Sequence, residues 1–503
     1  MAMITYDLDK RGRQSKYEYL YRCIRKDIRE GTLPAGVRLP SKRTLSEHLS
    51  VSVSTVEQAY DMLVSEGYVK PKLGSGFFVC AGRDKGTYPA GGADGSGALS
   101  ESAALVPTGG ALEDGAPAVD DDDDDNVRFD VKANRCSLKL FPVDTWSRIM
   151  RKTLSDRNPV LFETVPFNGV EVLRRAIAAH LYEFKGVQTT PDRIIVGAGT
   201  EYLYGRLLQL FGPNCVVAIG EVGTSKMVNV SRSIGTLWNY LPMDDEGMRV
   251  DSLDAGHADV VHVSPANSFP TGAVMPLSRR TKLLEWAHEN PDRYIIEDDY
   301  DSELRFTGRA LPPLFTQDDH DKVIYMNTFS KTLVPSLRIS YMVLPEALMD
   351  LYRRQLSFYS CTVSSFEQCA LAEFITRGYF ERHINRLRRY YGRQRAHVIA
   401  ALKASPLMAI AAVHAGDVGT HLILQVNTKR SDQEIRQAAL NRGMHLAMLA
   451  DYCLRPTIYD VHRIVINFAS IEPEQIQEVV DLLVDVFRDE IRLANEAKAG
   501  GRR

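Results

Sequence analysis

The sequence has little cysteine, almost no net charge and no long apolar run. Its seven cysteines among 503 residues are scattered, odd in number and form no Cys-x-x-Cys pair, so they indicate neither a disulfide framework nor a zinc site, and we expect no bound metal. The net charge of −3 gives no global sign of nucleic-acid binding. No run of about 18 apolar residues could span a bilayer, and the N-terminus lacks the apolar core of a signal peptide. These absences favour a reduced cytoplasmic protein with no membrane partner.

The length and the local charge predict several parts. A chain of 503 residues is too long for one ordinary core. Residues 1–80 carry 13 Lys and Arg against 9 Asp and Glu, whereas residues 81–130 carry 3 against 12. Residues 81–127 are rich in Gly, Ala, Ser and Asp, without periodicity, and cannot bury enough apolar surface to fold. We therefore expect a head at 1–80, a flexible acidic linker at 81–127 and a body at 128–503.

The head shows three helical patterns and then a hairpin pattern. Apolar residues at helical spacing run from Tyr17 to Ile28, a second helix can start after Ser41, and a third can be capped by Ser54 or Thr55. The stretch "YVKPKLGSGFFV" predicts two short strands around Gly74. Three helices and a glycine-tipped ribbon make a winged helix-turn-helix, whose third helix enters the major groove of DNA.

Two strand patterns of the body end in polar residues. The apolar run 294–296 is followed by "EDDY", and the run 323–326 leads to Ser330 and Lys331. In an open parallel sheet the carboxyl ends of the strands form the ligand-binding edge. A lysine that can form a Schiff base, a carboxylate for a pyridine nitrogen and a phenol for a ring hydroxyl together indicate pyridoxal phosphate (PLP) binding. The candidates for these three roles are Lys331, Asp298 and Tyr300.

These motifs also carry a resemblance. Asp298 and Lys331 are 33 positions apart and Arg338 follows seven later, a pattern similar to the fold-type I aminotransferases. More narrowly, "EDDYDSE" and "NTFSKTLVPSLR" resemble the MocR/GabR subfamily, and "LPSKRTLSEHL", "VSVSTVEQAY" and "GSGFFV" resemble its GntR-type head. The resemblance implies an α/β fold: a winged helix-turn-helix joined to a mostly parallel, doubly wound sheet with a smaller α+β C-terminal domain. We expect that smaller domain to contain the helical residues 366–402.

The resemblance also implies roles for particular residues. The phosphate of PLP would be held by Gly199, Thr200, Glu201, Ser330 and Arg338. The residue before Pro270 is Phe269 rather than the asparagine of aminotransferases, which leaves Asn267 as the substitute that would meet the ring oxygen. The implied DNA contacts are Arg43, Ser52, Ser54, Thr55 and Gly74, with backbone contacts from Lys70 and Lys72.

Two departures from the aminotransferase pattern concern catalysis. Thr224 replaces the tyrosine that stacks on the cofactor, and Val465 replaces the arginine that grips the substrate carboxylate. Arg463 is the nearby substitute, because it is two residues earlier on the same strand face and could hold the carboxylate of an effector.

Three functions remain open at this point. The leading interpretation is a homodimeric transcriptional regulator that binds a double-stranded DNA operator and senses PLP, or a PLP adduct of an amino acid or amine. The alternatives are an active aminotransferase with a DNA-binding head and a scaffold without cofactor. The intact residues Lys331, Asp298, Tyr300 and Arg338 argue against the scaffold. The changes at Thr224 and Val465 argue against full catalysis, so we expect at most partial transamination.

Overall fold

The structure, a computed structural model, divides into two compact units, residues 1–112 and 113–503. The residues it describes are 4–6, 16–29, 32–34, 36–49, 51–65, 68–72, 76–79, 127–132, 139–156, 159–223, 225–253, 257–307, 312–454 and 462–500. Except for residue 127, the expected linker therefore lies outside the described residues, as do Gly74 and Thr224.

The head contains the predicted three helices and hairpin. These are α1 (Lys16–Arg29), α2 (Lys42–His48) and α3 (Val53–Ser65), followed by the antiparallel strands β1 (Val69–Lys72) and β2 (Gly76–Val79). Leu20, Ile24, Leu45, Val56 and Leu63 are fully buried between these elements. The periodic apolar positions therefore form one small core, as the helical spacing predicts.

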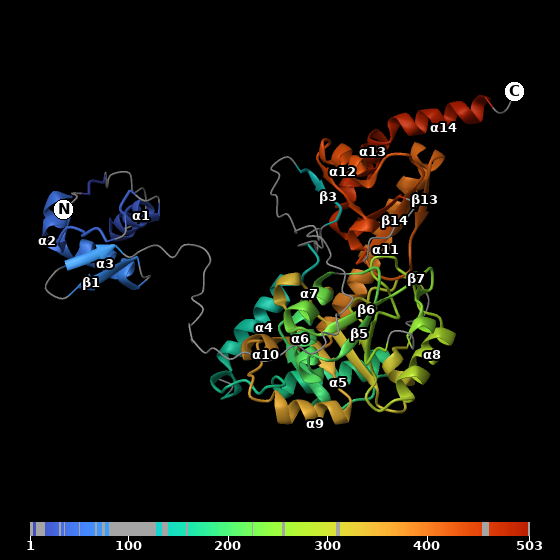
Figure 1. The fold of residues 1–503 in the computed structure, drawn as a ribbon, viewed down its shortest axis with the longest axis horizontal. Coiled ribbons are helices and arrows are strands. Elements are labelled where there is room, and N and C mark those ends of the chain that lie inside the picture. The colour runs from blue at the N-terminus through green and yellow to red at the C-terminus, as the bar shows by residue number, and fades with distance from the viewer. Residues whose placement is uncertain are drawn as a thin grey trace, which may run out of the picture. The chain divides into compact units, whose positions relative to one another are not determined.

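A seven-stranded sheet forms the centre of the body (Figure 1). Its order is β4 (Ile194–Gly197), β12 (Ser340–Val343), β11 (Val323–Thr328), β10 (Tyr294–Asp298), β9 (Val260–Val263), β5 (Val216–Gly220) and β6 (Leu237–Leu241). Only β12 runs antiparallel to its neighbours. The mostly parallel sheet predicted from the sequence is confirmed.

Successive residues of a central strand pack in different hydrophobic cores, because their side chains point to opposite faces of the sheet. In β11, Ile324 packs with residues of α6 (Thr200–Phe211) and α9 (Glu346–Gln355). Tyr325 faces the opposite core, which includes α5 (Glu171–Lys185) and α10 (Ser365–Thr376). Further helices of this part are α4 (Val143–Ser155), α7 (Ser225–Ile234) and α8 (Leu277–His288). Burial on both faces explains why the strands read as continuous apolar runs.

A smaller sheet with order β13–β14–β17–β16 forms the C-terminal part. Its strands are β13 (Ala411–His414), β14 (His421–Val426), β17 (His462–Asn467) and β16 (Ala447–Met448), accompanied by α12 (Asp432–Leu440), α13 (Ile476–Val486) and α14 (Arg488–Gly500). The prediction that residues 366–402 belong to this part is wrong for α10, which packs on α4 and α5 beside the large sheet. An apolar helix pattern identifies a buried face but does not say which core receives it.

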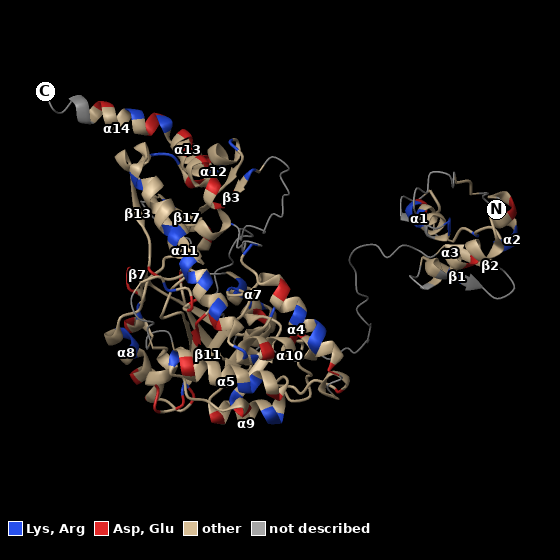
Figure 2. Cartoon of the chain, turned by 180° about the vertical axis from the view of Figure 1, so that it is seen from behind, with Lys and Arg blue, Asp and Glu red and all other residues tan. Residues whose placement is uncertain are grey.

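The long helix α11 (Tyr379–Ala404) joins the two parts of the body, and basic residues run along it (Figure 2). Arg388 Nε donates to the Glu303 carbonyl at 2.5 Å, and Arg395 donates to the carbonyls of Ala415 and Gly416 at 3.0 Å. These arginines hold loops of both parts in place. Among the described residues, no helix is both long and apolar enough to cross a membrane.

Candidate functional site

The carboxyl ends of β10 and β11 lie side by side and open onto one cavity. The two strands are parallel, and Asp298 is in register with Met326. The cavity has a volume of about 430 Å³, within the range of small-molecule sites. Its wall includes the predicted residues Thr200, Glu201, Asp298, Tyr300, Ser330, Lys331 and Arg338.

One corner of the cavity is suited to an anion. Gly199 has φ +99° immediately before α6, and a Cβ there would lie 2.1 Å from Arg338 Nη2. Arg338 donates to Glu201 Oε2 at 2.6 Å, and Lys226 Nζ lies 3.4 Å from Glu201 Oε1. Burial favours the neutral acid, but hydrogen bonds from the backbone and from Arg338 lower the pKa of Glu201. A helix N-terminus and two cations therefore meet at this corner of the cavity.

Ser330 and Asp298 belong to the cavity wall and hold buried polar atoms. Ser330 Oγ and Asp298 Oδ1 are buried, and neither has a hydrogen-bond partner among the described residues. The other oxygen of Asp298, Oδ2, lies 3.6 Å from His262 Nε2. Buried polar atoms without partners are rare and usually mark a place for a ligand, ion or water.

Lys331 and Tyr300 stand together in the cavity wall. Lys331 Nζ lies 5.9 Å from the centre of the Tyr300 ring. The Tyr300 hydroxyl accepts a hydrogen bond of 3.1 Å from Asn267 Nδ2. Burial, followed by the nearby aspartates, raises the pKa of Tyr300. The phenol is therefore protonated at neutral pH and can donate its proton to an acceptor in the cavity.

Asn267 is placed by an aspartate that the sequence reasoning did not select. Asn267 Nδ2 lies 2.9 Å from both carboxylate oxygens of Asp301. Burial raises the pKa of Asp301 to about 7, although the Asn267 hydrogen bond and the charge of Lys331 oppose the rise. The motif "EDDYDSE" contains Asp301, but nothing in the sequence distinguishes a buried acid there from a solvated one.

A buried ion cluster fixes the loop that carries Tyr300. Lys185 Nζ, at the end of α5, lies 2.7 Å from Asp299 Oδ2 and 2.8 Å from Glu303 Oε1. It also donates to Ser302 and Tyr325 at 2.8 and 3.0 Å. Burial alone would lower the pKa of Lys185, but the two carboxylates outweigh it and raise the pKa. No pattern in the sequence distinguishes Lys185, because its partners are more than 100 positions away.

The structure does not bring Arg463 to the cavity. Val465 is buried in β17 against Val222, Ala447 and Leu449. Arg463 shares its strand face but is not among the residues of the cavity wall, whereas Lys132 and His421 are. Burial, followed by the charge of Lys331, lowers the pKa of His421 to about 3. Lys132 is therefore a cation of the cavity wall that belongs neither to the corner around Arg338 nor to the ends of β10 and β11.

In the head, Ser52 caps α3, so the prediction of Ser54 or Thr55 as the cap is wrong. The Ser52 hydroxyl accepts from the Thr55 amide at 3.2 Å, and α3 starts at Val53. Ser54 and Thr55 instead belong to the first turn of the helix, where their hydroxyls lie 2.9 and 2.8 Å from Ser52 Oγ. Side chains of the predicted contacts Arg43, Ser52, Ser54 and Lys70 are exposed, and Thr55 is partly exposed. The side chain of Lys72 lies outside the described residues.

Known families match both units. The family of bacterial regulatory proteins named gntR matches residues 16–79, and the family aminotransferase class I and II matches residues 137–483. The regulator YdeL of Bacillus subtilis, described as an uncharacterized HTH-type transcriptional regulator, is 32% identical over 93% of this chain and 96% of its own. The probable rhizopine catabolism regulatory protein MocR of Rhizobium meliloti is 30% identical over 95% of each chain.

A solved aminotransferase shares the fold of the body. Kynurenine aminotransferase of Pyrococcus horikoshii superposes with a TM-score of 0.64 at 22% identity, over 73% of this chain and 91% of its own. The body thus has the fold of PLP-dependent aminotransferases. Together with the gntR match, this shows that the chain belongs to the MocR subfamily of transcriptional regulators, in which a GntR-type DNA-binding domain is fused to a fold-type I aminotransferase body.

Proposed function

We propose that this regulator binds PLP in the cavity of its body and uses it to sense an amino compound. One observation carries the proposal: Asp298 Oδ1 and Ser330 Oγ, both buried without a described partner, lie in one cavity wall with Lys331. These atoms fit the pyridine nitrogen and the phosphate of PLP. When bound, PLP supplies an aldehyde that joins amines covalently and a ring that withdraws electrons.

Each residue of the cavity has a defined part in this proposal. Asp298 would accept the proton of the pyridine nitrogen, and Tyr300, held by Asn267, would donate to the ring oxygen. Lys331 would provide the amine that attaches the cofactor. The amides of Gly199, Thr200 and Glu201, with Ser330 Oγ and Arg338, would hold the phosphate. Thr224 would lie beside the ring, by the resemblance of its motif.

The effector would be an amine or amino acid, because the aldehyde that PLP would supply joins amines. Lys132, rather than Arg463, would attract its carboxylate, because Lys132 is in the cavity wall. Tyr300 and Asp301 are the neighbours that would receive the charge of the Lys331 amine. An effector changes DNA binding only if it has different affinities for the two arrangements of the protein.

The head would bind its operator as part of a homodimer. Arg43 and the first turn of α3, with Ser52, Ser54 and Thr55, would face the bases, and Lys70, Lys72 and Gly74 would contact the backbone.

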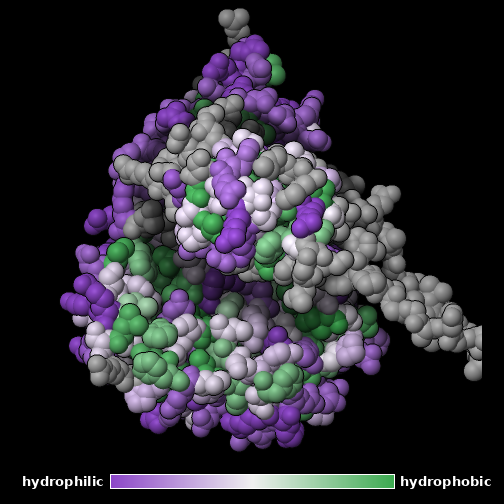
Figure 3. Space-filling view, turned by 90° about the vertical axis from the view of Figure 1, so that its left-hand side faces the viewer, coloured by the Kyte–Doolittle hydropathy of each residue, from purple (hydrophilic) through white to green (hydrophobic). Residues whose placement is uncertain are grey.

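Hydrophobic residues gather in patches on the lower half of the face shown in Figure 3. The large apolar side chains exposed on the body include Phe162 and Phe358, and pairing of two bodies would cover such side chains. We propose that the regulator acts in the cytoplasm, where its DNA operator lies.

Absorbance and DNA binding test the proposal together. The purified protein with PLP should absorb in the visible, and borohydride reduction followed by mass spectrometry should place the label on Lys331. Lys331→Ala should lose the label, whereas Lys403→Ala, a change on the exposed face of α11, should keep it. Operator affinity should change with PLP and with at least one amine.

Two results would count against the regulator that senses through PLP. A label that persists in Lys331→Ala would show that Lys331 is not the lysine that attaches the cofactor. Sustained keto-acid formation at about 1 per second or faster, with operator affinity unmoved by PLP or amines, would favour the working aminotransferase instead.

A further inference from the structure

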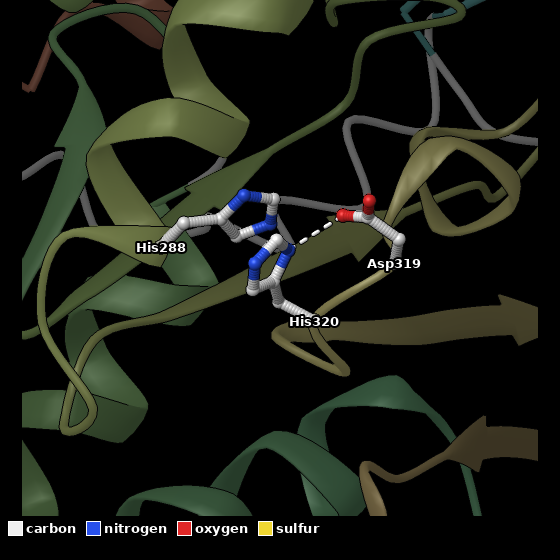
Figure 4. A group of neighbouring side chains, drawn as sticks. All are labelled: His288, Asp319 and His320. Carbon is white, nitrogen blue, oxygen red and sulfur yellow. Dashed lines mark hydrogen bonds and ion pairs between the residues drawn. The ribbon is translucent and has the colours of Figure 1, made fainter.

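Two histidines and an aspartate come together at the opposite end of β11 from Lys331. His288 is the last residue of α8, and Asp319 and His320 belong to the loop before β11 (Figure 4). One ligand atom from each side chain lies within 4.8 Å of the other two. The two imidazole rings are tilted by 32° with their centres 3.9 Å apart, and His320 Nδ1 lies 2.5 Å from Asp319 Oδ1. Nothing in the cofactor chemistry uses these residues.

A fourth residue orients one of the histidines. His288 Nε2 lies 3.1 Å from Asp318 Oδ1. Asp318 is itself fixed, because its carboxylate accepts hydrogen bonds from the amides of His320, Lys322 and Val323 at 3.1, 2.5 and 2.7 Å. A histidine that binds a metal usually donates its other ring N–H to a carboxylate, which fixes the tautomer. Asp318 therefore holds the His288 ring in place beside Asp319 and His320.

We propose that His288, Asp319 and His320 bind a divalent transition-metal ion, with Zn²⁺ as the best match. Imidazole nitrogen and carboxylate oxygen are ordinary zinc ligands, at about 2.0–2.2 Å in a tetrahedral site. That geometry places the ligand atoms about 3.3 Å apart, whereas the present ligand atoms lie within 4.8 Å of one another, so the side chains adjust their positions when the ion binds. Asp319 and His320 can move in this way, because their side chains are 81% and 56% exposed.

The ion would join two elements that are far apart in the sequence. His288 ends α8, whereas Asp319 and His320 precede β11 by a few residues. Binding only to the folded arrangement stabilises it, so the ion would fasten α8 to the start of the strand that leads to Lys331. The three protein ligands leave at least one position for water at this exposed site. The cavity that would hold PLP lies beyond the other end of β11, so the two sites are tested separately.

Calorimetric titration of the full-length protein with ZnCl₂ tests the site, with NiCl₂ and MgCl₂ as further probes. We expect one strong Zn²⁺ site per chain, weaker or comparable Ni²⁺ binding and no Mg²⁺ binding, since Mg²⁺ prefers oxygen ligands. His320→Gln and Asp319→Asn should each weaken Zn²⁺ binding by about 10-fold or more. Because both side chains are largely exposed, neither change should unfold the protein.

The control is His414→Gln, which removes an exposed histidine of β13 and should leave Zn²⁺ affinity unchanged. Thermal unfolding gives a second reading: Zn²⁺ should raise the melting temperature of the wild type and of His414→Gln but not that of His320→Gln. Equal Zn²⁺ affinity in the wild type and His320→Gln would overturn the proposal and assign the binding to other groups, such as the cysteines. Absence of Zn²⁺ binding to the wild type would overturn it as well.

Discussion

Removing the ammonium of Lys185 should destabilise the body by about 3–5 kcal/mol, the usual cost of leaving a buried charge without its partner. Lys185, Asp299 and Glu303 are 7%, 4% and 8% exposed, and the lysine lies within 2.8 Å of both carboxylates. Lys185→Met keeps the length of the side chain and deletes only the charge and its hydrogen bonds. The matched control is Lys152→Met, which removes a cation 3.0 Å from Glu373 at a site where Lys152 is 48% exposed. Such surface pairs contribute about 0–1 kcal/mol.

The loss should depend on pH with a defined sign. In the wild type, burial would raise the pKa of Asp299, but Lys185 and the hydrogen bonds from its neighbours lower it. This contribution is present above the unfolded pKa of about 4 and is lost as the pH falls below it. In Lys185→Met, burial is left to raise the pKa of Asp299, so a penalty grows as the pH rises through the raised value. The difference between the two proteins should therefore be small near pH 4 and largest near pH 8.

Urea unfolding followed by tryptophan fluorescence measures this difference in the body alone, because all three tryptophans, Trp146, Trp238 and Trp286, belong to the body. A destabilisation in Lys185→Met no larger than in Lys152→Met would refute the reasoning. So would a loss that is the same at pH 5 and pH 8.

Three further predictions concern the binding sites. Gly199→Ala should weaken PLP binding by about 10-fold or more, because the new Cβ would lie 2.1 Å from a guanidinium nitrogen of Arg338. Backbone strain at positive φ adds roughly 1 kcal/mol or more. The control is Gly186→Ala, which is also at positive φ but has open space around it and should leave PLP binding unchanged. Lys132→Ala should weaken the response of operator binding to amino acids more than the response to amines without a carboxylate. An unchanged response to amino acids in Lys132→Ala, together with a lost response in Arg463→Ala, would instead show that Arg463 holds the carboxylate. Arg43→Ala should weaken operator binding by about 1–3 kcal/mol if it reads a base, and an equal loss on random DNA would show a phosphate contact instead.

The sequence predicted the parts of the site that local patterns determine. A buried strand followed by polar residues is visible in the chain, and the rule that parallel strands share a ligand-binding edge brings Asp298 and Lys331 together. Ser52 was among the predicted DNA contacts, but its capping role was missed because Ser52, Ser54 and Thr55 all satisfy the same rule.

What the sequence could not predict depends on contacts between distant segments. Lys185 meets Asp299 over a separation of 114 positions, and only the packing of α5 on the sheet creates that pair. Arg463 lies outside the cavity wall for a related reason. Residues two apart share a strand face, but they are also about 6.6 Å apart along the strand, far enough to place Arg463 outside the cavity wall while Val465 packs beside it.

The ion pair between Arg338 and Glu201 has a consequence for ligand selectivity. The guanidinium donates at 2.6 Å to a carboxylate that is part of the same chain, so a free phosphate or sulfate ion must compete with a tethered anion for the same donor. An anion that is also anchored at a second point is held at a high effective concentration and can win that competition. The corner would therefore favour ligands with two attachments. An inorganic anion has one attachment and would gain little, whereas a phosphorylated aldehyde joined to Lys331 would have two.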